Sequence, residues 1–110
     1  MAEPASTEPS DPASEHPRNR LDPLIHQPVR FSVMATLAET YEAEFAFVRD
    51  TVQLTDSALS KAVSVLEDAG YVRVRKAFVG KFPRTWLKLT KDGHTAFTAH
   101  LAALRDIVGN

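Results

Sequence analysis

The sequence contains no cysteine among its 110 residues. This absence excludes disulfide bonds, thiolate zinc sites and cysteine nucleophiles. Long apolar runs are missing too: no stretch approaches the roughly 18 to 20 residues of a membrane-spanning helix, and the N-terminus lacks the apolar segment of a signal peptide. We therefore expect a cytoplasmic protein with no membrane partner.

Patterns that carry catalysis or bind metals are also missing. Gly80 and Gly93 stand alone, so a glycine-rich phosphate loop is not supported. The serines lack a glycine-flanked elbow and a supporting His/Asp pair, which argues against a nucleophile. No cysteine or paired carboxylate accompanies the four histidines, His16, His26, His94 and His100. We expect no enzyme activity, no metal and no cofactor.

Acidic residues are missing from one segment of the chain, although the whole chain is nearly neutral. The net charge is −1, which by itself argues against a polyanionic partner. However, residues 73–91 contain seven basic side chains and no acid, whereas residues 22–68 contain eight acids and three bases. The sequence therefore predicts a cationic patch on a nearly neutral protein.

Residues 1–20 carry four prolines and almost no large apolar side chain. Such a segment cannot bury enough surface to offset its ordering entropy. We expect a disordered tail over 1–20, more simply a solubilising extension than a modulator of binding, and one folded domain over 21–110.

Residues 55–69 are the best-defined helix. Thr55 is a suitable N-cap, Gly70 suits a left-handed C-terminus, and Leu59, Val63 and Leu66 form one apolar stripe. Before it we expect a helix over 28–40, a very short strand over 45–47 and a helix over 47–53.

After Gly70 the apolar period changes from about 3.6 residues to 2. Strands are predicted over 71–75 and 85–89, joined by a hairpin tip over 79–84. Thr90 can then begin a last helix. Its apolar residues average 3.5 positions apart, as in a short coiled-coil seam: Phe97, Leu101, Leu104 and Val108.

The runs LTDSALSKAVSVLEDAGYVRVRK and FPRTWLKLTKDG resemble the winged helix-turn-helix domains of bacterial and archaeal transcriptional regulators, particularly the small MarR-like group. The AGYV junction and the PRTWLKLT return are the most diagnostic pieces, and the resemblance covers residues 21–108. It implies an α+β, mainly α fold with a three-helix core, a β-hairpin wing and a C-terminal helix. It also implies sequence-specific binding to double-stranded DNA.

A major groove about 12 Å wide admits one α-helix. We expect helix 55–69 to enter it and the wing, residues 72–89, to contact the flanking backbone or minor groove. The expected DNA contacts are Thr55, Ser57, Ser60, Lys61, Ser64, Arg75, Lys76, Lys81 and Arg84. Asp56 would repel phosphate, so we expect it to cap the first turn or to accept from a cytosine. For Phe78, Phe82 and Trp86 we favour packing against the helices over stacking on bases.

So few phosphate contacts would bind weakly, which favours a dimer reading two half-sites, and we expect a repressor associated with the nucleoid. The expected dimer interface comprises Leu24, Ile25, Phe97, Leu101, Leu104 and Val108. The alternative is that these residues complete the core of a single chain. A small-molecule effector pocket between the first and last helices stays open, without a named ligand.

A second hypothesis is a winged-helix protein–protein interaction module that does not contact DNA. The two hypotheses differ in salt dependence, because binding to DNA weakens steeply as salt rises.

Overall fold

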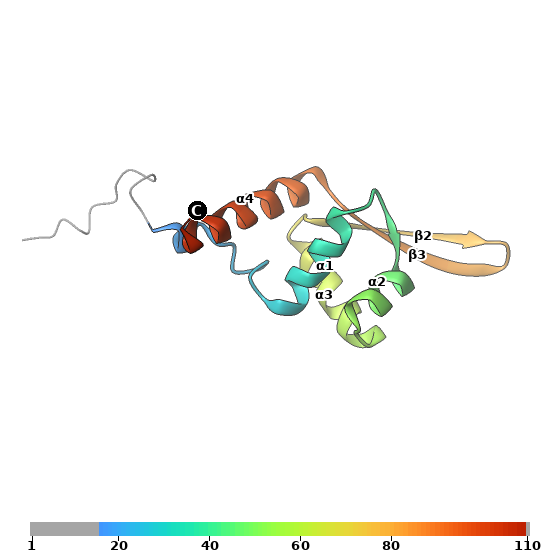
Figure 1. Ribbon diagram of the computed structural model, residues 1–110. Helices are drawn as coiled ribbons and strands as arrows, with labels where there is room; N and C mark the ends of the chain where they lie inside the picture. Colours follow the sequence, from blue (N-terminus) through green and yellow to red (C-terminus); the bar gives the residue numbers. More distant parts are fainter. Residues whose placement is uncertain (1–15, 110) are drawn as a thin grey trace, which may run out of the picture.

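A computed structural model describes residues 16–109. The helices are η3 (Pro17–Arg20, a 3-10 helix), α1 (Pro28–Ala38), α2 (Phe45–Val52), α3 (Asp56–Asp68) and α4 (Lys91–Val108), and the strands are β1 (Ala43–Glu44), β2 (Val72–Val79) and β3 (Phe82–Leu89) (Figure 1). The strands form one antiparallel sheet in the order β1-β3-β2. This is the expected fold: three core helices, a long β-hairpin and a C-terminal helix.

The core lies where the first three helices meet the base of the hairpin. Leu37 of α1, Val48 of α2, Leu59 and Leu66 of α3 and Leu87 of β3 have no exposed surface. Burying each such side chain is worth about 1.5–3 kcal/mol, so this cluster fixes how α3 sits beneath the hairpin. Toward its tip, the hairpin extends away from the helices (Figure 1).

Helix α3 begins and ends as its sequence predicts. The Thr55 hydroxyl accepts a hydrogen bond from the Ala58 amide at 3.0 Å. At the other end Gly70 has φ +83°, and the Tyr71 amide donates to the Leu66 carbonyl at 2.9 Å. The chain therefore leaves α3 through a tight left-handed turn directly into β2.

The short strand precedes the predicted position. Ala43 and Glu44 pair with Leu87 and Trp86, and the helix then begins at Phe45. The prediction of a strand over 45–47 was wrong because buried Ala43 and its neighbour Glu44 pair with β3, while Phe45 packs against the core cluster as the first helical residue. Helix α1 ends at Ala38 rather than at 40, because the Glu39 and Thr40 amides donate to carbonyls three residues back, Thr36 and Leu37, instead of four.

The hairpin is longer than predicted. Its register runs unbroken from Val72 opposite Leu89 to Val79 opposite Phe82, leaving a two-residue turn in which Gly80 has φ +64°. The predicted strands stopped where the apolar alternation stops. Main-chain hydrogen bonds continue past that point because pairing does not need a buried face.

The folded part begins earlier than predicted. Residues 17–20 form helix η3, which packs against α4, and Arg20 forms an ion pair with Asp106 at 2.7 Å. The expected disordered tail is therefore corrected for these residues, since contacts with α4 hold them. Residues 1–15 lie outside the described part, and the expectation for them stays a prediction.

No helix within residues 16–109 is both long and apolar enough to cross a membrane.

Candidate nucleic-acid interface

The outer face of α3 is exposed along its first two turns. Its buried face consists of Leu59, Ala62, Val63 and Leu66. The opposite face presents the four predicted base contacts Ser57, Ser60, Lys61 and Ser64. Thr55 is exposed too, and its oxygen already accepts one hydrogen bond as the helix cap. Its hydroxyl proton is free to donate to a phosphate.

A hollow of about 290 Å³ lies between α3 and the hairpin. Ser60 and Ser64 line it from α3, and Lys76 and Thr85 line it from the two strands. Three hydroxyls and one ammonium group in one open hollow can donate hydrogen bonds to a phosphate. Glu67 lies at the same hollow and would repel an anion placed near it. The hollow therefore favours a phosphate nearer the N-terminal half of α3.

The cations of the wing are divided between its two faces. Residues paired across the hairpin share a face, so Lys76 and Thr85 lie on the side of α3. Arg75 pairs with Trp86 and Ala77 with Arg84, which places both arginines on the other face. The sequence run of basic residues is thus not one continuous patch.

Both of these arginines are paired with acids at strand β1, Glu42 just before it and Glu44 within it. Arg75 donates to Glu42 through Nε at 3.0 Å and Nη2 at 2.8 Å, and Arg84 forms an ion pair with Glu44. The hydrogen bond from Arg75 holds the pKa of Glu42 below its usual value. The expectation that both arginines contact phosphate stays a prediction, in which each exchanges a carboxylate partner. Exposed ion pairs are worth only about 0–1 kcal/mol, so that exchange costs little.

Asp56 has a different role from the one predicted. Its carboxylate accepts from Arg49 Nη1 at 2.8 Å, and the same guanidinium donates from Nε to Asp50 at 2.9 Å. These two hydrogen bonds, the one to Asp50 first, raise the pKa of Arg49. Arg49 of α2 therefore offsets the acid at the N-terminus of α3. Sequence analysis missed this contact because the residues lie seven apart across a helix-turn-helix.

The aromatic residues of the wing differ in exposure. Trp86 is half-buried, with the Arg75 guanidinium 5.4 Å from its ring centroid. Phe78 is 73% exposed and Phe82 is 68% exposed. The prediction that they pack against the helices was wrong for both phenylalanines, because the paired strands carry them beyond the helical core.

The residues expected at the dimer interface fall into two groups, buried and accessible. Ile25 has no exposed surface and Phe97 only 7%, and both belong to the core of the single chain. For these two residues the expectation is corrected in favour of the alternative of a completed core. Leu24, Leu101 and Leu104 are half-buried, and Val108 is exposed. Ile107, which the heptad pattern did not select, is exposed beside Val108.

A histidine pair lies at the junction of α1, α4 and the preceding loop. His100 is buried, and its Nδ1 accepts from the Asp22 amide at 3.1 Å. The neutral ring then carries its proton on Nε2, which donates to Nδ1 of His26 at 3.3 Å. Burial lowers the pKa of His100, the charge of His26 lowers it further, and Asp22 opposes both. Within residues 16–109 no three His, Asp or Glu side chains gather as a metal site would require.

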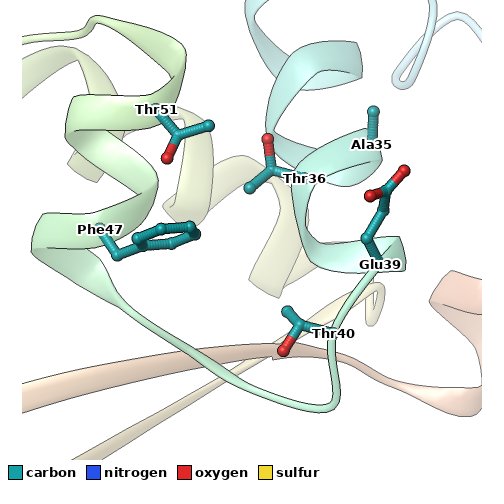
Figure 2. A pocket seen from close by; sticks show the side chains of 6 residues that line it. All are labelled: Ala35, Thr36, Glu39, Thr40, Phe47 and Thr51. Atoms are coloured by element: carbon teal, nitrogen blue, oxygen red, sulfur yellow. The ribbon is translucent and has the colours of Figure 1, made fainter.

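Two further hollows flank α1. One of about 240 Å³ is lined by His26, Gln27, Pro28, Phe31 and Leu104, in the region where we expected an effector pocket. The other, of about 510 Å³, lies between α1 and α2 (Figure 2). Glu39 is the one charged residue in the lining of the second hollow, which therefore does not suit an anion.

A helix-turn-helix with an exposed polar second helix, followed by a β-hairpin, defines a winged helix-turn-helix protein. The family description "Winged helix DNA-binding domain" matches residues 29–108. The chain belongs to this family, a class of DNA-binding regulators and not of enzymes.

The chain is similar to proteins from archaea and bacteria. A Methanocaldococcus jannaschii protein is 25% identical over 87 residues, 79% of this chain and 95% of that protein. A transcriptional regulator homologue from Pyrococcus horikoshii has a TM-score of 0.74 at 27% identity, over 77% of this chain and 84% of that one. The PcaV transcriptional regulator from Streptomyces coelicolor has a TM-score of 0.70 at 18% identity, over 83% of this chain and 63% of that one, and supports the fold alone.

Proposed function

We propose that this protein is a sequence-specific regulator that binds double-stranded DNA with α3 in the major groove and the wing on the flank. The observation that carries the proposal is the hollow in which Ser60 and Ser64 of α3 face Lys76 and Thr85 of the hairpin. A phosphate strand separates a major groove from the neighbouring minor groove. A hollow with donors on both walls suits that strand.

The exposed face of α3 supplies the groups for reading bases. Lys61 can donate to guanine acceptors, and the serine hydroxyls can donate or accept. Ser57 and Lys61 lie four residues apart, on one side of the helix and close to its N-terminus. That end of a recognition helix approaches the base edges in helix-turn-helix complexes.

We propose further that the protein acts as a homodimeric repressor, cytoplasmic and bound to the nucleoid. The exposed Ile107 and Val108 at the end of α4, beside half-buried Leu104, support pairing through this helix. Two-fold pairing would match two half-sites about one helical turn apart. PcaV was solved with its natural ligand, and a small effector could act here at the hollow lined by His26 and Leu104.

The second candidate is a protein–protein interaction module. The ion pairs of Arg75 and Arg84 with acids favour it, because they reduce the charge offered to a polyanion. Salt separates the two candidates, since neutralising phosphates makes affinity fall steeply with salt concentration.

The test is selection of bound duplexes from a random pool, followed by affinity measurements over a salt series. We expect a recurring half-site and a steep salt slope. The triple variant Lys61→Ala, Lys76→Ala, Lys81→Ala should lose most of the binding, with the slope reduced by about 2–3. The matched control Arg18→Ala, Lys91→Ala, Arg105→Ala removes equal charge from exposed positions off the hollow and should bind normally. No enriched duplex, or equal losses for both variants, would contradict the proposal.

A further inference from the structure

The tip of the wing exposes large apolar side chains. We define the wing tip as residues 78–83, in which Phe78, Val79 and Phe82 are 73%, 53% and 68% exposed. Val79 faces Phe82 across the last pair of the hairpin, and Phe78 faces Pro83 across the pair before it. The tip is therefore a narrow apolar wedge two residue pairs deep, held at the end of a two-stranded ribbon.

The surroundings of this wedge are cationic. Lys76 and Lys81 are exposed, and neither joins an ion pair among the described residues. Residues 73–91 contain no acid. An apolar tip with a positive rim is complementary to a partner that has anionic edges and an apolar interior.

We propose that the wing tip inserts Phe78 between base pairs in the minor groove beside the α3 site and kinks the duplex there. This inference rests on the proposed function. Proteins that bind the minor groove use such apolar wedges to unstack a base step.

The position of Phe78 within the hairpin supports this geometry. Phe78 lies two residues beyond Lys76 on the same strand and therefore on the same face, the one that lines the hollow with α3. When the hollow holds the phosphate strand and α3 lies in the major groove, the next part of the wing reaches the neighbouring minor groove. Phe78 is the first large side chain to arrive there.

The dimensions of the ribbon limit insertion to side chains of the tip. Paired backbones lie about 4.8 Å apart, so the ribbon with its own atoms is wider than a B-form minor groove of about 6 Å. Pro83 pairs with Phe78 and shares its face, whereas Phe82 pairs with Val79 and would line the groove from the opposite face of the tip. Pyrimidine–purine steps unstack most easily, so the wedge should favour such a step in the flank of the operator.

The experiment uses the full chain and the duplex obtained by selection, labelled with 2-aminopurine at the flanking step and with a donor and acceptor dye at its ends. We expect the wild-type protein to raise 2-aminopurine fluorescence and to shorten the end-to-end distance. The double variant Phe78→Ser, Phe82→Ser should lose both signals and about tenfold in affinity, with an unchanged circular dichroism spectrum and salt slope. The control Phe47→Ser removes an aromatic ring that is 58% exposed on α2 and should retain both signals.

Other outcomes would overturn the wedge. Tight binding to an unbent, fully stacked duplex by both wild type and double variant would reject it while leaving the DNA-binding proposal intact. Failure of the wild type to bind any duplex would reject the DNA-binding proposal itself. Phenylalanine-dependent binding to phosphatidylglycerol vesicles, or phenylalanine-dependent self-association, with unchanged DNA affinity would assign the tip to a lipid surface or to a second copy instead.

Discussion

At the scale of single residues, a chain of hydrogen bonds ties three parts of the fold together. The Tyr71 hydroxyl, just after α3, donates to the Asp22 carboxylate at 2.6 Å, and the Asp22 amide donates to His100 of α4. The hydrogen bond to Asp22 is the main cause that raises the pKa of Tyr71 to about 12. These contacts fix α4 relative to the turn from which the wing leaves α3.

The buried His100 should make stability depend on pH. Its pKa is lowered in the folded chain, so below about 6.5 the unfolded chain takes up the proton first. Stability is then lost as pH falls from neutral through this range. We expect the midpoint of thermal unfolding to fall between pH 7 and pH 5.5, and to fall less in His100→Gln, which keeps a hydrogen-bonding group that does not titrate. Equal slopes for the two proteins would assign the effect to other groups.

Gly93 is required by a close approach of α4 to the end of α3. A Cβ atom at this position would lie 2.1 Å from the Tyr71 carbonyl oxygen, a backbone atom with little room to move. We expect Gly93→Ala to destabilise the fold by about 1–3 kcal/mol, measured by urea unfolding. Thr95→Ala on the exposed side of α4 is the control and should change stability by less than about 0.5 kcal/mol.

At the scale of elements, the sequence predicts the helices and strands whose alternation of buried and exposed residues can be read within the segment itself. Helix α3 shows its stripe, its cap at Thr55 and its turn at Gly70, and the base of the hairpin shows strict alternation. The two-residue β1 was misplaced because its pairing partner, Leu87, lies 44 positions further along from Ala43. The exposure of Phe78 and Phe82 was missed because apolar character alone does not tell how far a hairpin projects beyond its core.

The sequence predicts which residues of the candidate site are exposed, but not which acids pair with its arginines. The serines and Lys61 of α3 are exposed as expected, since the opposite stripe is apolar. The ion pairs of Glu42 and Glu44 with arginines of the wing depend on the register of β1 with β3. Local patterns do not fix that register.

Glu42 and Glu44 should therefore weaken the electrostatic part of DNA binding. Replacing Glu42 and Glu44 by glutamine releases Arg75 and Arg84 without changing the shape of the side chains. We expect Glu42→Gln, Glu44→Gln to bind non-specific duplex more tightly and with a steeper salt slope, by about 1–2. Glu39→Gln, which removes one exposed acid at the hollow between α1 and α2, is the control for the loss of an acid away from the wing. A double variant that behaves like wild type would show that these arginines do not reach phosphate.

At the scale of the whole molecule, the exposed end of α4 is the surface best suited to pair two chains. Ile107→Glu with Val108→Glu places charge on this surface without entering the core, since both positions are exposed. We expect analytical ultracentrifugation to show a monomer for the variant and a dimer for the wild type. Affinity for a two-half-site duplex should fall by tenfold or more, and affinity for a single half-site should not change. A wild-type protein that sediments as a monomer while bound to one half-site would contradict pairing through α4.

The arrangement of α3 and the wing is tested most directly by nuclear magnetic resonance. Isotope-labelled protein would be titrated with the selected duplex, and the change at each backbone amide would be followed along the chain. We expect the largest changes over residues 55–64 of α3 and 76–82 of the wing. Changes centred on α4 or on the hollow between α1 and α2, with residues 55–64 unaffected, would contradict binding of DNA by this face.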